Sequence, residues 1–157
     1  MERELMLRVV LERPPAGVDF GLQNGRGSAY ETIQKQRLQS DTAGADGIDL
    51  RFEFTLRVKA RGNDPIPAFL GPLVQGPSRE RFVYIDIGTY AGQTDTFWSR
   101  RLKIPLGGIT WEMIELLGDH PATVLEARVP GAARDGGPNC GTAKLLEGWR
   151  LNNAPRG

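Results

Sequence analysis

The residue types most suited to chemistry gather in residues 81–87, where a carboxylate interrupts an otherwise apolar stretch. Side chains alternate between the two faces of an extended strand, so Tyr84 and Asp86 share one face. A carboxylate on a strand that is apolar on both faces must find hydrogen-bond donors or shift its pKa. Arg81 and Arg101 are the candidate charge partners. The pattern predicts a polar anchor in a ligand pocket, and a structural, hydrogen-bonded aspartate is the alternative.

A second cluster combines aromatic and basic side chains between Trp98 and Lys103, with Arg100 and Arg101 between them. Such a group can stack on a ring or hold an anion, and the alternative is a solvated face beside core packing. A polar loop over residues 134–139 is a further candidate, because loops carry binding residues more often than cores do. The ligand-binding residues that we predict from these segments are Arg81, Tyr84, Asp86, Trp98, Arg101, Asp135 and Asn139.

Catalytic and metal-binding signatures are missing from the sequence. The chain has one histidine, His120, and one cysteine, Cys140, which excludes an internal disulfide and the usual Cys/His zinc clusters. It has neither a Walker-type phosphate loop nor the glycine fingerprint of dinucleotide-binding folds. We therefore assign no catalytic residue, metal or cofactor. An enzyme that uses Asp86 or Asp135 with His120 or Cys140 is the open alternative, and it requires at least two of these groups to meet in a pocket.

The bulk properties of the chain suit one soluble domain that spans residues 1–157. The 20 basic and 19 acidic side chains give a formal net charge of +1, which argues against a dedicated nucleic-acid or acidic-membrane binder. No stretch approaches the roughly 18 apolar residues of a membrane span. Charges also interrupt the apolar residues near the N-terminus, unlike the core of a signal peptide. We therefore expect a cytoplasmic location, with neither nucleic acid nor membrane as a partner.

The elements that must position these side chains are mostly short strands. With 20 glycines and 11 prolines, the chain has material for many turns. A helix is predicted near residues 110–117, where Thr110 can cap the N-terminus and Gly118 suits the C-terminal end. Apolar patterns predict strands over residues 4–12, 18–24, 51–59, 81–87, 98–106, 124–129 and 145–151. Residues 30–38 are polar and weakly patterned, and an exposed strand is preferred there over a helix turn. The expected fold is all-β: an antiparallel β-sandwich or partly open barrel of about seven to nine strands.

Three segments are predicted to connect these elements or to lie beside them. Residues 68–77 contain two Gly-Pro pairs, and they belong at a sheet edge or in a loop because proline cannot donate to a strand ladder. Residues 40–47 and 130–142 are small, polar and rich in glycine, which is typical of loops.

Several runs of sequence are distinctive enough to compare with known families. They are Leu11 to Pro15, Phe20 to Gln23, Gly71 to Pro77 followed by Arg81 to Ile85, Trp98 to Leu106, and Pro130 to Pro138. Together they resemble a family of small bacterial single-domain proteins catalogued as a domain of unknown function. The resemblance extends over almost the whole chain. It implies a single domain, and it brings no activity, ligand or site residue.

Three functional hypotheses follow from these patterns. The leading one is a binding module that takes a small organic or anionic ligand near Tyr84 and Asp86, since small barrels and sandwiches host pockets. The second is a protein-interaction domain, which would form a homodimer through a strand edge or an apolar face. The third is the enzyme described above, and the absence of a catalytic signature argues against it.

Overall fold

The computed structural model describes residues 2–15, 17–26, 29–37, 51–62, 67–70, 82–90, 96–119 and 122–153. Strands dominate this part of the chain, so the all-β prediction is confirmed. The elements are β1 (Glu2–Glu12), β2 (Val18–Arg26), β3 (Ala29–Arg37), β4 (Arg51–Arg61), β5 (Ala68–Leu70), β6 (Phe82–Tyr90), β7 (Thr96–Pro105), α1 (Trp111–Asp119), β8 (Thr123–Pro130), β9 (Gly141–Thr142) and β10 (Glu147–Asn153).

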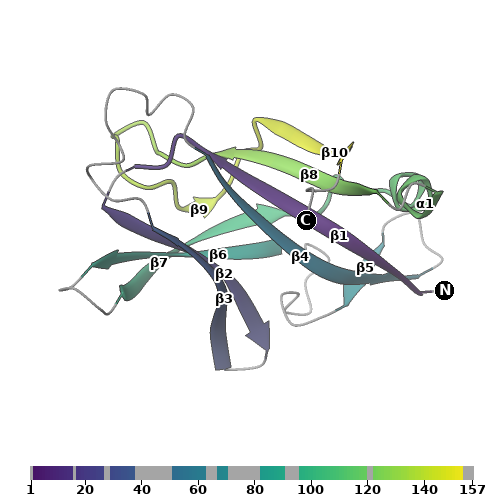
Figure 1. Cartoon of the computed structure of the whole chain (residues 1–157), viewed down its shortest axis with the longest axis horizontal. Coiled ribbons are helices and arrows are strands. Elements are labelled where there is room, and N and C mark those ends of the chain that lie inside the picture. The colour runs from purple at the N-terminus through teal and green to yellow at the C-terminus, as the bar shows by residue number, and fades with distance from the viewer. Residues whose placement is uncertain are drawn as a thin grey trace.

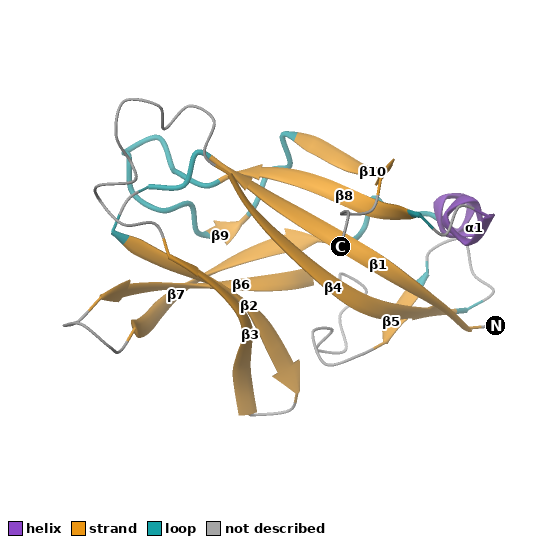
Figure 2. Ribbon diagram, in the orientation of Figure 1, coloured by secondary structure: helices purple, strands orange, loops and turns teal. Residues whose placement is uncertain are grey.

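The described strands form two five-stranded sheets that pack as a sandwich (Figure 1). Sheet A has the order β10-β8-β1-β4-β5, and sheet B has the order β3-β2-β6-β7-β9. Most neighbouring strands are antiparallel, as predicted, but β1 pairs with β8 and β7 pairs with β9 in parallel. Figure 2 shows two open layers rather than a closed barrel. The sandwich alternative of the sequence prediction is therefore the one that the chain adopts.

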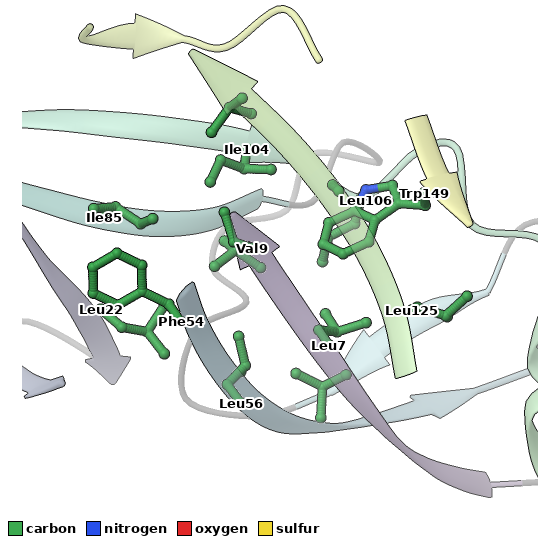
Figure 3. Close-up of a cluster of buried hydrophobic side chains, with 14 of the residues drawn as sticks. Leu7, Val9, Leu22, Phe54, Leu56, Ile85, Ile104, Leu106, Leu125 and Trp149 are labelled. Atoms are coloured by element: carbon green, nitrogen blue, oxygen red, sulfur yellow. The ribbon is translucent and has the colours of Figure 1, made fainter. Parts of the chain in front are cut away.

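The space between the two sheets is filled by alternating apolar side chains, as Figure 3 shows. The rings of Phe20 on sheet B and Phe52 on sheet A meet edge to face, with 6.1 Å between their centroids. Each fully buried side chain of this size contributes about 1.5–3 kcal/mol relative to an exposed one. Trp149 is buried, and its indole nitrogen donates a hydrogen bond to the carbonyl oxygen of Pro105 at 2.7 Å. Fully buried core residues include Leu7, Val9, Leu11, Phe20, Leu22, Phe54, Ile85, Leu102, Ile104 and Leu125.

Helix α1 lies at one end of sheet A, beside the N-terminus of the chain, where it contacts β1, β8 and β10 (Figure 1). The predicted cap is confirmed, because the hydroxyl of Thr110 accepts a hydrogen bond from the amide of Met113 at 3.3 Å. Ile114 and Leu117 bury the inner side of the helix. The helix continues through Gly118 to Asp119, two residues beyond the predicted end. Within the described residues, no helix is long and apolar enough to cross a membrane.

Two short strands at sheet edges raise the strand number above the predicted seven to nine. Strand β5 has three residues and forms one edge of sheet A, as expected for the start of segment 68–77. Strand β9 has two residues and emerges from the predicted loop 130–142 to pair with β7. Strand β6 also continues to Tyr90, three residues beyond the predicted end of the strand at residue 87. The predicted loop 40–47 and residues 71–77 lie outside the described residues.

The loop between β8 and β9 is tied to the end of β1 by backbone contacts. The amide of Gly131 donates to the carbonyl oxygen of Glu12 at 2.7 Å, and the amide of Asn139 donates to the carbonyl oxygen of Gly131 at 3.0 Å. A Cβ atom on Gly131 would lie 2.8 Å from the Cα atom of Pro14. Glycine is therefore required for this close approach, which fixes where the loop leaves β8.

Candidate functional site

The outer face of sheet B carries the residues that the sequence singled out on strand 81–87. Strands β6 and β7 are antiparallel neighbours, and their register places Asp86 opposite Arg101 and Tyr84 opposite Lys103. The opposite faces of these strands supply Val83, Ile85, Leu102 and Ile104 to the core. Strand alternation therefore turns Phe82, Tyr84, Asp86, Arg101 and Lys103 to the outside. We call these five residues the outer face of sheet B.

Arg101 is the centre of this face because it contacts two of its neighbours. Its Nε atom lies 3.4 Å from Oδ1 of Asp86, and its guanidinium carbon lies 4.9 Å from the centre of the Tyr84 ring. The first distance is long for a charge-assisted hydrogen bond. About a third of the Arg101 side chain is exposed (34%), whereas Asp86 is buried. Asp86 and the Tyr84 ring thus orient the guanidinium group, and part of the Arg101 side chain remains exposed to solvent.

A second cation and a second ring extend the face along the strands. The ammonium nitrogen of Lys103 lies 6.0 Å from the centre of the Phe82 ring. The rings of Phe82 and Tyr84 are 6.3 Å apart and tilted by 41°. Both rings are only partly buried, and Lys103 is exposed. Two cation–aromatic pairs therefore stand side by side, which offers apolar surface and positive charge in the same place.

Strand β6 is central in sheet B, between β2 and β7, but its outer face is partly exposed. A strand that is apolar on both faces is usually covered on both. In the structure Phe82 and Tyr84 remain partly exposed. Asp86 is buried at a position whose cross-strand partner on β2 is Gly21, and the neighbouring Asp19 is buried opposite Gly88. Sequence reasoning missed Asp19, since only the strand register places it diagonally from Asp86.

The structure brings together three of the predicted ligand-binding residues: Tyr84, Asp86 and Arg101. Asp135 lies apart, where its carboxylate accepts a hydrogen bond from the amide of Gly137 at 2.9 Å and closes a turn. Asn139 uses its side-chain amide to donate to the carbonyl oxygen of Pro130 at 2.8 Å. These bonds organise the β8–β9 loop. Arg81 and the side chain of Trp98 lie outside the described residues.

The groups needed for the enzyme alternative are not joined by the contacts of the described residues. Asp86 pairs with Arg101, and Asp135 bonds within its own turn. Cys140 is exposed beside the start of β9, and His120 lies outside the described residues. Over the part of the chain that the structure describes, no cluster of three or more His, Cys, Asp or Glu side chains could hold a metal ion.

A second polar cluster, which sequence reasoning missed, lies on the outer face of sheet A. Its centre is Glu126 on β8, only 2% of which is exposed. One carboxylate oxygen accepts a hydrogen bond from Nε of Arg8 at 2.6 Å and also contacts Nη2 of the same arginine. The other oxygen accepts from Nδ2 of Asn152 at 3.1 Å and from Nε of Arg128 at 3.3 Å. Both oxygens of this buried carboxylate are thereby satisfied.

Arg128 extends this cluster to two further carboxylates. Its Nη1 atom lies 3.0 Å from Oε1 of Glu12, and its Nε atom lies 3.7 Å from Oε2 of Glu147. Arg150 in turn contacts Glu147 at 2.9 Å. We call the whole group the Glu126 network. It holds three arginines and three glutamates, so its formal charges balance. Its members are Arg8, Glu12, Glu126, Arg128, Glu147, Arg150 and Asn152.

Ionisation in the Glu126 network is fixed by its geometry. Burial by itself would raise the pKa of Glu126, but the hydrogen bonds from Arg8 and Asn152 and the charge of Arg8 outweigh that effect. The pKa of Glu126 therefore lies below its ordinary value of 4.5. The hydrogen bond to Glu126 raises the pKa of Arg128. Both shifts favour the charged forms of Glu126 and Arg128.

The chain matches the model of a family of unknown function, DUF5990, over residues 5–152. Because this match covers nearly the whole chain, the protein belongs to that family. No curated protein and no solved structure matches the chain.

Proposed function

We propose that this member of the DUF5990 family is a binding module whose outer face of sheet B takes a small anionic organic ligand. One observation carries the proposal: Arg101 is held by Asp86, lies over the Tyr84 ring and still exposes about a third of its side chain. An arginine fixed in this way presents the exposed part of its side chain to a ligand at small entropic cost.

The neighbours of Arg101 define the chemistry of the ligand. Lys103 adds a second positive charge, and the partly exposed rings of Phe82 and Tyr84 add apolar surface. A carboxylate or phosphate group would accept hydrogen bonds from Arg101. A flat apolar group attached to it would contact the two rings. Asp86 acts as a positioning residue that fixes the arginine and does not itself meet the ligand.

Chemical-shift titration with three small probes tests this proposal. Benzoate carries both a ring and an anion, inorganic phosphate carries only the anion, and benzyl alcohol carries only the ring. We expect benzoate to bind best and to shift the backbone signals of Tyr84 and Arg101. The variant Arg101→Ala should lose this response. Arg51→Ala is the matched control, since Arg51 pairs with Glu53 on the other sheet.

Two outcomes would contradict the proposal. The first is that none of the three probes shifts signals on β6 or β7 at millimolar concentration. The second is that Arg101→Ala and Arg51→Ala bind benzoate as well as the unmodified protein does.

A homodimer is the second candidate, and the position of β3 favours it. This nine-residue strand stands at the edge of sheet B, and among the described residues it pairs only with β2. An edge strand of this length offers backbone donors and acceptors to a second chain. Light scattering over a hundredfold range of concentration tests the idea. A mass that rises to twice the monomer mass supports it, and a constant monomer mass rules it out.

A further inference from the structure

A surface pocket of about 380 Å³ lies where the C-terminal end of α1 meets the start of β1. Its wall consists of residues 4–6 of β1, Arg57 of β4, Leu117 and Gly118 of α1, and Thr123 of β8. This volume is near the lower end of the range for small-molecule sites, about 300–1,000 Å³. The pocket belongs to sheet A and is independent of the function proposed for sheet B.

The pocket exists because β1 begins before its neighbour β8 does. Strand β1 starts at Glu2, whereas its parallel pairing with β8 starts only at Leu7. On the other side, β4 pairs with β1 from Glu2 onwards. In the described part of the chain, residues 2–6 therefore lack a strand partner on the β8 side. The end of α1 stands beside this gap, and the hollow between them is bordered by backbone as well as side chains.

The pocket combines an apolar wall with two opposite charges. The apolar part of the wall comes from the partly buried Met6 and from the accessible edges of Leu5 and Leu117, whose side chains are otherwise buried in the core, and Arg57 contacts Glu4 at 3.1 Å. Both charged side chains are substantially exposed, 68% for Arg57 and 48% for Glu4. An exposed ion pair of this kind contributes little to stability, because water screens its charges. A ligand can therefore separate the two groups at small cost and satisfy each with its own charge.

The end of α1 adds a preference for positive charge close to Glu4. The last carbonyl groups of a helix have no partner within the helix and form the negative end of its dipole. Within Trp111–Asp119 the last turn contains no basic residue. Gly118, in this turn, borders the pocket. A cationic group of a ligand would thus meet both the carboxylate of Glu4 and these carbonyl oxygens.

We propose that this pocket binds a free α-amino acid with an apolar side chain. Its carboxylate pairs with Arg57, its ammonium group pairs with Glu4 and the end of α1, and its side chain contacts Leu5, Met6 and Leu117. Such a zwitterion supplies a counter-charge to both Arg57 and Glu4. A ligand with only one charge would leave the other partner without its counter-ion.

Isothermal titration with leucine and two blocked analogues tests this inference. N-acetyl-leucine lacks the ammonium group, and leucinamide lacks the carboxylate. We expect leucine to bind at least about tenfold more tightly than either analogue. Arg57→Gln should weaken leucine by at least about tenfold and leave leucinamide unchanged. Glu4→Gln should weaken leucine and leave N-acetyl-leucine unchanged. Arg51→Gln, on the same strand as Arg57 and also paired with a glutamate, is the matched control.

Three results would overturn the inference: no binding of leucine at millimolar concentration, equal affinity for leucine and its blocked analogues, or a loss of affinity in Arg51→Gln as large as in Arg57→Gln. Thermal unfolding of each variant separates binding from folding, because an exposed pair contributes little to stability. Benzoate binding on sheet B should be the same in Arg57→Gln as in the unmodified protein, so this site and the one on sheet B can fail separately.

Discussion

The outer faces of the two sheets both carry a buried carboxylate next to an arginine, but they use it differently. On sheet A, Glu126 accepts hydrogen bonds from three side chains, and the surrounding arginines and glutamates balance in charge. On sheet B, Asp86 meets Arg101 at a longer distance, and Arg101 and Lys103 extend into water beside partly exposed rings. In the first arrangement the charges are balanced by other side chains of the protein, whereas in the second positive charge and aromatic surface are partly exposed to solvent.

This difference shows why a buried charge is a poor guide to a binding site by itself. When the protein itself supplies all the partners of a buried carboxylate, the group is structural, and removing one partner destabilises the fold because it leaves a buried charge without its counter-charge. The side chains around it matter more than its burial, because a ligand needs groups that still gain from a partner. The exposed charge and the partly exposed rings make the outer face of sheet B the better candidate for a binding site.

The largest expected effect is on sheet A. Glu126→Gln should lower the free energy of unfolding by about 3–5 kcal/mol, because it leaves the buried charge of Arg8 without its counter-charge. Urea unfolding followed by circular dichroism measures this loss. Replacing both partners, as in Arg8→Met with Glu126→Leu, should recover most of it, since apolar side chains of similar size can fill the space of a buried pair. A loss below about 1 kcal/mol for Glu126→Gln would contradict the role given to the network.

The second expectation concerns acid stability and follows from the lowered pKa of Glu126. A carboxylate with a folded-state pKa below its unfolded value stabilises the fold at pH values above the unfolded value, near 4.5. That contribution is lost as the pH falls through the lower, folded value. The unfolding free energy of the unmodified protein should therefore decrease as the pH falls below about 4.5, and that of Glu126→Gln should decrease less steeply. Parallel curves for the two proteins would count against this assignment.

A smaller effect is expected on sheet B. Asp86→Asn keeps the shape of the side chain and removes its charge, so it should cost about 1–2 kcal/mol, less than Glu126→Gln. The same urea measurement compares the two variants directly. If Asp86→Asn were the more destabilising of the two, Asp86 would belong to the structural framework, as the plainer interpretation of the sequence suggests.

The smallest effect is expected at Lys103, which is exposed. Lys103→Ala should change the unfolding free energy by no more than about 0.5 kcal/mol, yet weaken benzoate binding. Lys144→Ala is a suitable control because Lys144 is also exposed. Equal benzoate affinity in both variants would remove Lys103 from the site.

Local patterns predicted the strands and the helix well, because apolar alternation and helix capping depend on residues that are close together in the sequence. The charge pair between Asp86 and Arg101 was also accessible, since two adjacent strands bring them together. The Glu126 network could not be predicted, because Arg8 and Glu126 are 118 residues apart in the sequence and meet only through the parallel pairing of β1 with β8. Glu126 does carry the same local signal as Asp86, a carboxylate within an apolar strand. The pocket beside α1 depends on where β8 begins relative to β1, which no sequence pattern reveals.

The most direct test compares Arg101→Gln with Arg128→Gln, the arginines beside the two buried carboxylates. We expect Arg128→Gln to lose about 2 kcal/mol of stability and to keep benzoate binding per folded molecule. Arg101→Gln should keep nearly all its stability and lose benzoate binding. Chemical-shift titration and urea unfolding of both variants give the answer. If the two substitutions had the same effect on binding, the distinction between a purely structural Glu126 network and a ligand-binding outer face of sheet B would be wrong.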